Sequence, residues 1–259
     1  MCRIIAIANQ KGGVGKSTST GSLGAGLAKR GKRVLVIDAD SQGSLTESMG
    51  YRNPDEMTVS LATLLTKVIN DEDPEPTEGI LHHAEGFDLL PCNIDLASLE
   101  VAMVNVMSRE TVLKRYLKPV QEQYDYILID CMPSLGVMTI NALAAADSVL
   151  IPVQAAYLPV KGLQQLLKTI SRVKRQMNPR LRIEGILVTM ADYRTNYAKD
   201  VTRLMMENYG QSIRIFSHAI PLSVRAAETS AEGVSIYRYD PNGKVAAAYD
   251  ALTEEVMAG

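Results

Sequence analysis

The chain has 259 residues, of which 46% are apolar and 22% charged, and these proportions are typical of a folded globular protein rather than of a disordered chain or a fibrous repeat. Its 27 Lys and Arg residues against 29 Asp and Glu residues give a net charge of -2, which excludes a histone-like polycation but allows a local basic face. The three cysteines, Cys2, Cys92 and Cys131, are widely spaced and form no CxxC pair. The sequence therefore supports neither a disulfide framework nor a four-thiolate zinc site, and it favours a reducing cytoplasm.

Membrane segments are not expected from the apolar pattern. The apolar stretch at the N-terminus is too short for a signal peptide. The longest apolar stretch, Ala142 to Val160, is interrupted by Asp147, Gln154 and two prolines, so we interpret it as buried α/β core.

Short apolar runs alternate with windows of helical spacing along the whole chain. Several runs are almost continuously apolar, which is typical of strands covered on both faces of a parallel sheet. Together they predict an α/β fold in which a single domain, residues 1–259, forms a mostly parallel twisted sheet with helices on both faces. The expected strands are Ile4–Ala8, Val34–Ile37, Phe87–Leu90, Tyr126–Ile129, Val149–Val153 and Ile183–Thr189. The helices that we identify are Ser17–Arg30, Lys161–Met177 and Gly243–Met257, and Asp71–Gly79 is expected to be an acidic surface loop within the less regular region 50–86.

A glycine-rich turn follows the first expected strand and opens the first expected helix. Its glycines allow backbone N–H groups to point inward, and the helix N-terminus adds partial positive charge, so the turn is suited to binding phosphates. Lys16 can reach the β- and γ-phosphates of a nucleotide, and the Ser17 hydroxyl can ligate Mg²⁺. The strict GxxxxGK[ST] pattern fails because Gln10 occupies the first Gly position, and a second lysine, Lys11, starts the turn. The expected nucleotide-binding residues of the turn are Lys11, Gly12, Gly13, Val14, Gly15, Lys16, Ser17 and Thr18.

Acidic residues end two of the expected strands. Asp38 and Asp40 close the run VLVIDAD, and Asp130 closes the run YILID, which has the pattern of a Walker-B strand. Because the carboxyl ends of parallel strands meet at the edge where ligands bind, we expect these carboxylates to lie near the phosphate-binding turn. Any one of them alone could instead be a helix cap or turn residue.

Three motifs resemble the ParA/Soj branch of the ParA/MinD ATPases, which are P-loop NTPases with a deviant Walker-A motif and a signature lysine. They are KGGVGKST at 11–18, VLVIDADSQGSLT at 34–46 and YDYILIDCMPSLG at 124–136. The similarity continues through 151–167, 185–196 and 220–249 and so covers nearly the whole chain, and these later motifs favour partition proteins. The resemblance implies ATP and Mg²⁺ as cofactors. It also implies a cycle in which ATP closes a homodimer, the dimer binds double-stranded DNA without sequence preference, and a ParB-like partner triggers slow hydrolysis. The protein would then be cytoplasmic and associated with the nucleoid, and it would partition a plasmid, a chromosome or a mobile element.

The resemblance also implies roles for individual residues. Lys16 would bind phosphates in its own subunit, and Lys11 would reach the nucleotide of the partner subunit. Ser17 would ligate Mg²⁺, with Asp38 and Asp130 in the water shell of the metal, and Asp40 would position the attacking water. The sequence departs from the family at two places, where Ser41 stands for a common Pro and Cys131–Met132 for a common Thr-Pro pair.

The charge is unevenly distributed. Residues 161–214 contain eleven Lys and Arg against four acids, a net charge of +7, whereas the rest of the chain carries -9. A basic segment within an acidic chain fits binding to a phosphate backbone, although solvated helix faces are the simpler alternative. By family analogy Arg194 and Arg225 are candidates for DNA contact, which Lys199 and Arg203 could extend, and Pro221 and Ser223 are candidates for contact with the adenine base.

Three other functions remain open at this point. A MinD-like positioning ATPase shares the nucleotide site but binds membranes through a basic amphipathic helix, whereas the helix expected at Gly243–Met257 is acidic. A protein of the nitrogenase-iron-protein type would need Cys92 and Cys131 as cluster ligands, and neither lies in a Gly-rich ligand loop. A nucleotide-dependent regulatory switch with negligible turnover would have the same motifs.

Overall fold

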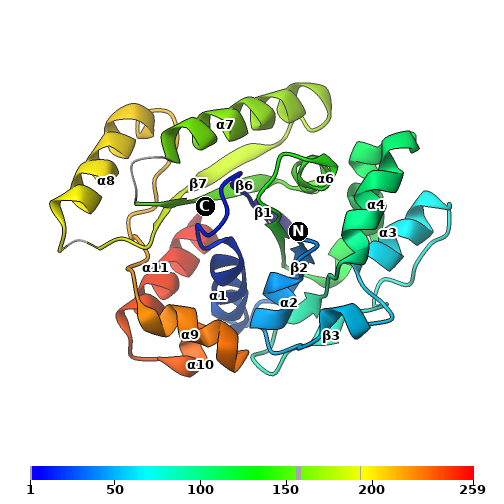
Figure 1. Cartoon of the computed structure of the whole chain (residues 1–259), viewed down its shortest axis with the longest axis horizontal. Coiled ribbons are helices and arrows are strands. Elements are labelled where there is room, and N and C mark those ends of the chain that lie inside the picture. The colour runs from blue at the N-terminus through cyan, green and yellow to red at the C-terminus, as the bar shows by residue number, and fades with distance from the viewer. Residues whose placement is uncertain (1, 156–158, 193) are drawn as a thin grey trace.

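The sheet is the centre of the molecule. The structure is a computed structural model that describes residues 2–155, 159–192 and 194–259. These residues form a seven-stranded sheet in the order β3-β4-β2-β5-β1-β6-β7, and every neighbouring pair is parallel except β3 and β4 (Figure 1). The expectation of a mostly parallel α/β sheet is therefore confirmed. The strands are β1 (Arg3–Ile7), β2 (Val34–Ala39), β3 (Leu81–His82), β4 (Asp88–Leu90), β5 (Tyr126–Cys131), β6 (Ser148–Gln154) and β7 (Arg182–Thr189).

Helices connect the strands and cover both faces of the sheet. Figure 1 shows α7 on one side of β6 and β7, with α1 and α11 on the other. The helices are α1 (Lys16–Lys29), α2 (Ser44–Ser48), α3 (Leu61–Ile69), α4 (Asp95–Ala102), α5 (Val112–Val120), α6 (Val137–Ala145), α7 (Pro159–Gln176), α8 (Asn196–Tyr209), α9 (Val224–Glu232), α10 (Ile236–Tyr239) and α11 (Lys244–Ala258), and the short 3₁₀ turns are Pro54–Glu56, Met103–Asn105, Arg109–Thr111 and Gln121–Gln123. None of the helices in the described ranges is long and apolar enough to cross a membrane.

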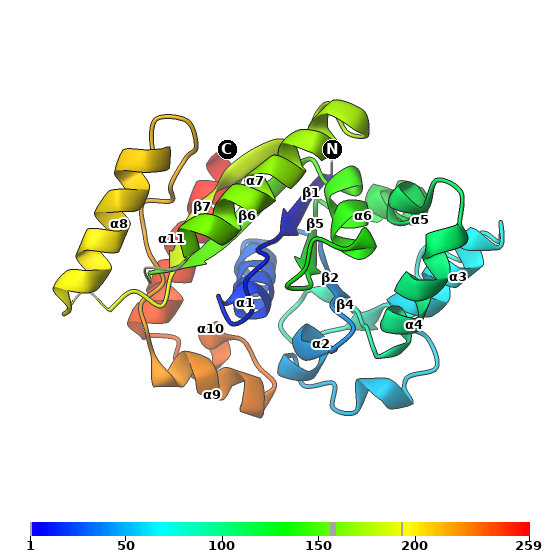
Figure 2. The ribbon, with the colours of Figure 1, turned by 45° about the horizontal axis from the view of Figure 1, so that its top comes forward.

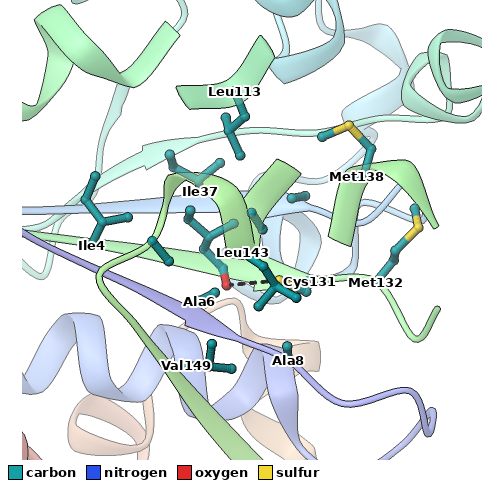
Figure 3. Packing of buried hydrophobic residues seen from close by; sticks show 14 of the residues in the cluster. Ile4, Ala6, Ala8, Ile37, Leu113, Cys131, Met132, Met138, Leu143 and Val149 are labelled. Carbon is teal, nitrogen blue, oxygen red and sulfur yellow. Dashed lines mark hydrogen bonds between the residues drawn. The ribbon is translucent and has the colours of Figure 1, made fainter. Parts of the chain in front are cut away.

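The two faces of the sheet have separate hydrophobic cores. Side chains alternate along a strand, so Ile4 and Ala6 belong to one core while Ile5 and Ile7 belong to the other. The first core packs beneath α3 to α8, and the second beneath α1, α2, α10 and α11. Figure 3 shows part of the first core, where Ile37 of β2 lies near Leu113 of α5 and Leu143 of α6. Burial on both faces explains why the strands are continuously apolar in sequence.

The expected elements are confirmed with small shifts at their ends. All six expected strands are present, and β2 and β5 each run two residues further, to Ala39 and Cys131. Region 50–86 is more ordered than its sequence indicated, because it contains α3 and the short antiparallel strand β3. Ser60 and Thr63 start α3 as a capping box, and the Ser60 backbone N–H donates to Thr63 Oγ1 at 2.7 Å. Residues 71–79 form a loop, as expected.

Candidate nucleotide site

The glycine-rich turn joins the end of β1 to the start of α1 at the carboxyl edge of the sheet (Figure 2). Gly13 and Gly15 have φ angles of 69° and 82°, in the left-handed region that side-chain-bearing residues disfavour. α1 begins at Lys16, so the free backbone N–H groups of its first turn lie directly after the loop. This is the geometry of an anion site at a helix N-terminus.

The base of the turn is fixed by two side chains that the sequence motifs did not single out. Asn9 accepts a hydrogen bond from the Lys11 backbone N–H at 3.0 Å and donates to the Pro152 carbonyl at 2.6 Å. At the other end of the turn, Thr189 Oγ1 donates to the Val14 carbonyl at 2.8 Å. Both partners come from the neighbouring strands β6 and β7, so the turn is tied to the sheet on two sides.

Lys16 is buried beneath the turn, whereas Lys11 is only half-buried. Lys16 Nζ donates to the Lys11 carbonyl at 3.2 Å, so the ammonium group is held inside the loop where phosphates would bind. Burial lowers the pKa of Lys16, and the nearby Asp130 carboxylate opposes that shift. A desolvated cation in this position is stabilised by any anion that enters the loop.

Asp38 and Asp130 lie side by side at the ends of β2 and β5, where they are register partners. Both are fully buried. Asp130 Oδ1 accepts a hydrogen bond from Thr20 Oγ1 at 3.3 Å, while its Oδ2 atom is buried and has no hydrogen-bond partner among the described residues. Burial raises the pKa of Asp130, and the neighbouring Asp38 raises it further. Burial is also the main reason that the pKa of Asp38 is raised.

This pair of carboxylates fits a bound divalent cation. Two adjacent buried carboxylates resist being ionised together, and the nearby Lys16 offsets this only in part, so a bound cation would remove the remaining repulsion. The unpartnered Asp130 oxygen would accept a hydrogen bond from a metal-bound water, and Ser17 lies in the first turn of the adjacent helix α1. Mg²⁺ usually keeps several waters and binds through one or two carboxylates together with nucleotide phosphates.

Asp40 lies at the rim of this site and is partly exposed. Its backbone N–H donates to Asp38 Oδ1 at 3.1 Å, and its own Oδ1 accepts from the Gln42 backbone N–H at 3.1 Å. The predicted residues therefore divide into a buried group, Lys16, Asp38 and Asp130, and a rim group that contains Lys11 and Asp40.

The segment with Pro221 and Ser223 reaches the same edge of the sheet. Pro221 forms a β-bridge with Ala191, directly after the end of β7. That end also packs near the phosphate turn, because a Cβ atom on Gly15 would lie 3.9 Å from Met190 Cε. The structure thus brings Pro221 towards the turn, while Ser223 is half-buried as the residue before α9.

The basic candidates for DNA contact lie around α8 and α9 and are exposed. Three of them have acidic neighbours that the sequence pattern did not predict. Arg194 makes two hydrogen bonds of 2.8 Å to Asp192. Arg203 pairs with Asp200 at 2.9 Å and Arg225 with Asp240 at 2.9 Å. Lys199, on α8, is also exposed, and the side chain of Lys161, which opens the basic segment, lies outside the described residues.

The sequence motifs did not reveal the residues that orient the phosphate turn and the buried aspartates through hydrogen bonds. Asn9, Thr20, Thr46 and Thr189 each hydrogen-bond to the phosphate turn or to a buried aspartate. Thr20 carries a usable signal, since it lies four residues after Lys16 and so on the same side of α1. Thr46 and Thr189 carry none, because Thr46 is separated from Asp38 by a turn and Thr189 is distant in sequence from Val14.

Comparisons with known proteins agree with this geometry. The AAA_31 family model, described as an AAA domain, matches residues 2–183. The chain is 43% identical over 259 residues to the sporulation initiation inhibitor protein Soj of Bacillus subtilis (strain 168), covering 100% of this chain and 99% of Soj. It is also 43% identical over 256 residues to the chromosome-partitioning ATPase Soj of Thermus thermophilus, covering 99% and 96%.

A solved structure adds a bound nucleotide to the comparison. Cobyrinic acid a,c-diamide synthase from Mycobacterium smegmatis, with a bound ATP analog and magnesium, aligns with a TM-score of 0.86 and 38% identity over 98% of this chain and 93% of that chain. The full-length match to both Soj proteins and the deviant phosphate turn lead to one conclusion: the chain belongs to the ParA/Soj family of ATPases.

Proposed function

We propose that the protein is an ATP hydrolase that uses Mg²⁺, dimerises when ATP binds, and attaches non-specifically to double-stranded DNA. With a ParB-like partner it would drive segregation of a plasmid, chromosome or mobile element in the nucleoid. The observation that carries the proposal is the burial of Lys16, Asp38 and Asp130 together beneath the phosphate turn. The names of the Soj relatives support the partition role.

The buried group would bind and position ATP. In this proposal Lys16 and the backbone N–H groups of the turn neutralise the phosphates, and Ser17 with the water shell held by Asp38 and Asp130 binds Mg²⁺. When bound, the metal would supply charge neutralisation at the nucleotide phosphates. Phosphoryl transfer is catalysed mainly by positioning and charge neutralisation, and the buried group would supply part of both.

The rim group would make hydrolysis depend on assembly. Lys11 is half-buried at the mouth of the turn, a position from which we propose it reaches the nucleotide of a second copy. Asp40, also at the rim, would orient the attacking water. A lysine supplied by the partner would act as an arginine finger does and complete charge neutralisation only in the dimer.

The exposed arginines remain our candidates for DNA contact despite their acidic neighbours. Exposed ion pairs contribute only about 0–1 kcal/mol, so DNA phosphates can replace Asp192 or Asp240 as partners at little cost. The exposed fraction of the side chain is 88% for Arg194, 68% for Arg203 and 63% for Arg225. Their guanidinium groups are therefore accessible to the phosphates of a DNA duplex. Arg194, Lys199, Arg203 and Arg225 together form the proposed DNA surface.

The two lysines of the turn provide the test of this proposal. Lys16→Ala should abolish ATP binding in titration calorimetry. Lys11→Ala should keep ATP affinity but lose both ATP-dependent dimerisation, measured by light scattering, and hydrolysis. Lys29→Ala is the control, since Lys29 is exposed at the far end of α1. If the two turn variants lose ATP affinity to the same extent, Lys11 acts within its own subunit and the dimer-dependent cycle is contradicted.

A further inference from the structure

Thr46, in α2, makes direct contact with the buried carboxylate of Asp38. The Thr46 backbone N–H and its Oγ1 hydroxyl both donate to Asp38 Oδ2 at 2.8 Å. Thr46 is itself completely buried, so solvent does not compete for either bond. A short connection allows this contact, because the chain turns back after β2 and brings α2 over the end of that strand.

The direction of the hydroxyl proton is set by a third hydrogen bond. The Cys92 backbone N–H donates to Thr46 Oγ1 at 3.1 Å. A hydroxyl has one proton to donate, and with a lone pair engaged by Cys92 that proton points to Asp38. Thr46 therefore links Asp38 to the segment that follows β4.

Close packing holds this link in place. Gly43, just before α2, has a φ angle of 60°, and a Cβ atom there would lie 3.0 Å from the Cys92 carbonyl oxygen and 2.9 Å from Pro54 Cγ. The start of α2 is thus pressed against the Cys92 segment, which leaves the Thr46 side chain little freedom to turn away. The other oxygen of Asp38 is occupied by the Asp40 backbone N–H at 3.1 Å. Both oxygens of Asp38 are consequently oriented by neighbours.

We propose that Thr46 is a positioning residue for the metal site: its hydroxyl fixes the orientation of the Asp38 carboxylate beside Asp130 and thereby sets the affinity for the divalent cation. This inference rests on the proposed function, because the cation site belongs to the proposed ATPase. Partners that orient a metal-binding group typically change metal affinity by 10- to 100-fold when they are removed. Thr46 touches neither the phosphate turn nor Lys16 in any hydrogen bond of the described residues, so nucleotide affinity without metal should not depend on it.

The test is a titration of Mn²⁺, as a spectroscopic substitute for Mg²⁺, into the full-length protein with ADP, followed by electron paramagnetic resonance. Thr46→Val, which keeps the shape of the side chain and removes the hydroxyl, should weaken Mn²⁺ binding by about 10- to 100-fold. Thr46→Ser, which keeps the hydroxyl, should restore most of the affinity. ADP affinity in EDTA should be the same in all three proteins. Thr253→Val is the matched control, since Thr253 is also completely buried and donates its hydroxyl to the Tyr249 carbonyl in α11, on another part of the fold.

The outcomes separate the inference from the proposed function. Wild-type Mn²⁺ affinity in Thr46→Val, or equal weakening in Thr46→Ser and Thr46→Val, overturns the role of the hydroxyl. Equal weakening in Thr253→Val assigns the effect to general destabilisation and overturns it as well. If Thr46→Val does not fold by circular dichroism, Thr46→Ala replaces it. A wild-type protein that binds Mn²⁺ with ADP but never hydrolyses ATP contradicts the proposed function and still leaves the comparison of variants decisive for Thr46.

Discussion

The fold places two groups of charged residues in opposite environments. One group lies buried at the carboxyl edge of the sheet, and the other lies exposed around α8 and α9. At the edge, Lys16, Asp38 and Asp130 are buried, and one Asp130 oxygen lacks a partner among the described residues. Around α8 and α9, Arg194 and Arg225 are exposed, and each has an acid of its own chain beside it. Buried charges that the fold leaves uncompensated favour a ligand strongly, whereas exposed pairs exchange partners at little cost. The first region should therefore dominate affinity for the nucleotide, and the second should respond to salt.

The removal of one charge from the carboxyl edge should have the largest effect. Asp130→Asn removes the repulsion with Asp38, so we expect the variant to be more stable than the wild type in EDTA without nucleotide, and to lose hydrolysis. The expected rise in Tm is a few degrees, because one kcal/mol corresponds to about 2–4 °C in a chain of this size. Differential scanning calorimetry and phosphate release measure the two effects.

The control for this prediction is an aspartate in the opposite situation. Arg33 holds the pKa of Asp125 down, to about 2, through a hydrogen-bonded pair that is exposed to solvent. Asp125→Asn should therefore leave Tm unchanged or lower it slightly. A fall in Tm for Asp130→Asn would mean that the buried pair is already compensated within the chain.

The second prediction addresses the exposed region. Arg194→Glu should weaken binding to double-stranded DNA and lower the slope of log affinity against log salt by about 1, while ATP affinity stays the same. Fluorescence anisotropy with DNA at several salt concentrations measures both quantities. Arg33→Glu is a matched control, because Arg33 is also an exposed, ion-paired arginine but lies at the other edge of the sheet. Equal losses in the two variants would point to overall charge instead of a defined surface.

The smallest expected effect concerns a partly buried group outside both regions. Burial lowers the pKa of His83, whose ring stacks on Phe87 with centroids 4.4 Å apart and whose Nδ1 accepts from the Glu85 backbone N–H. The folded state therefore holds this imidazole neutral below its ordinary pKa of about 6.5, while the unfolded state takes up a proton. Stability contributed by His83 is complete above that value and is lost as the pH falls. Glu85 opposes the shift and Arg238 adds to it.

Urea unfolding between pH 7.5 and 5 measures this effect. The free energy of unfolding should fall less steeply with decreasing pH in His83→Gln than in the wild type. Identical slopes would show that His83 is protonated equally in both states.

The sequence was most informative where burial or backbone conformation restricts which residue types fit. Continuous apolar runs predicted the strands because both faces of the sheet are covered, and Gly13 and Gly15 marked the turn because it needs positive φ angles. The partners of the site were not predictable in the same way. Thr46 reaches Asp38 only because α2 folds back over β2. Arg225 meets Asp240 through the packing of α9 and α10, which no local pattern records.

In the proposed cycle the buried edge controls the exposed surface, so that ATP decides whether DNA is bound. The most direct measurement is the affinity of the folded protein for non-specific double-stranded DNA with ATP and Mg²⁺, with ADP and Mg²⁺, and without nucleotide, each at several salt concentrations. We expect tight, salt-sensitive binding with ATP and much weaker binding in the other two states. Equal affinity in all three states would contradict it.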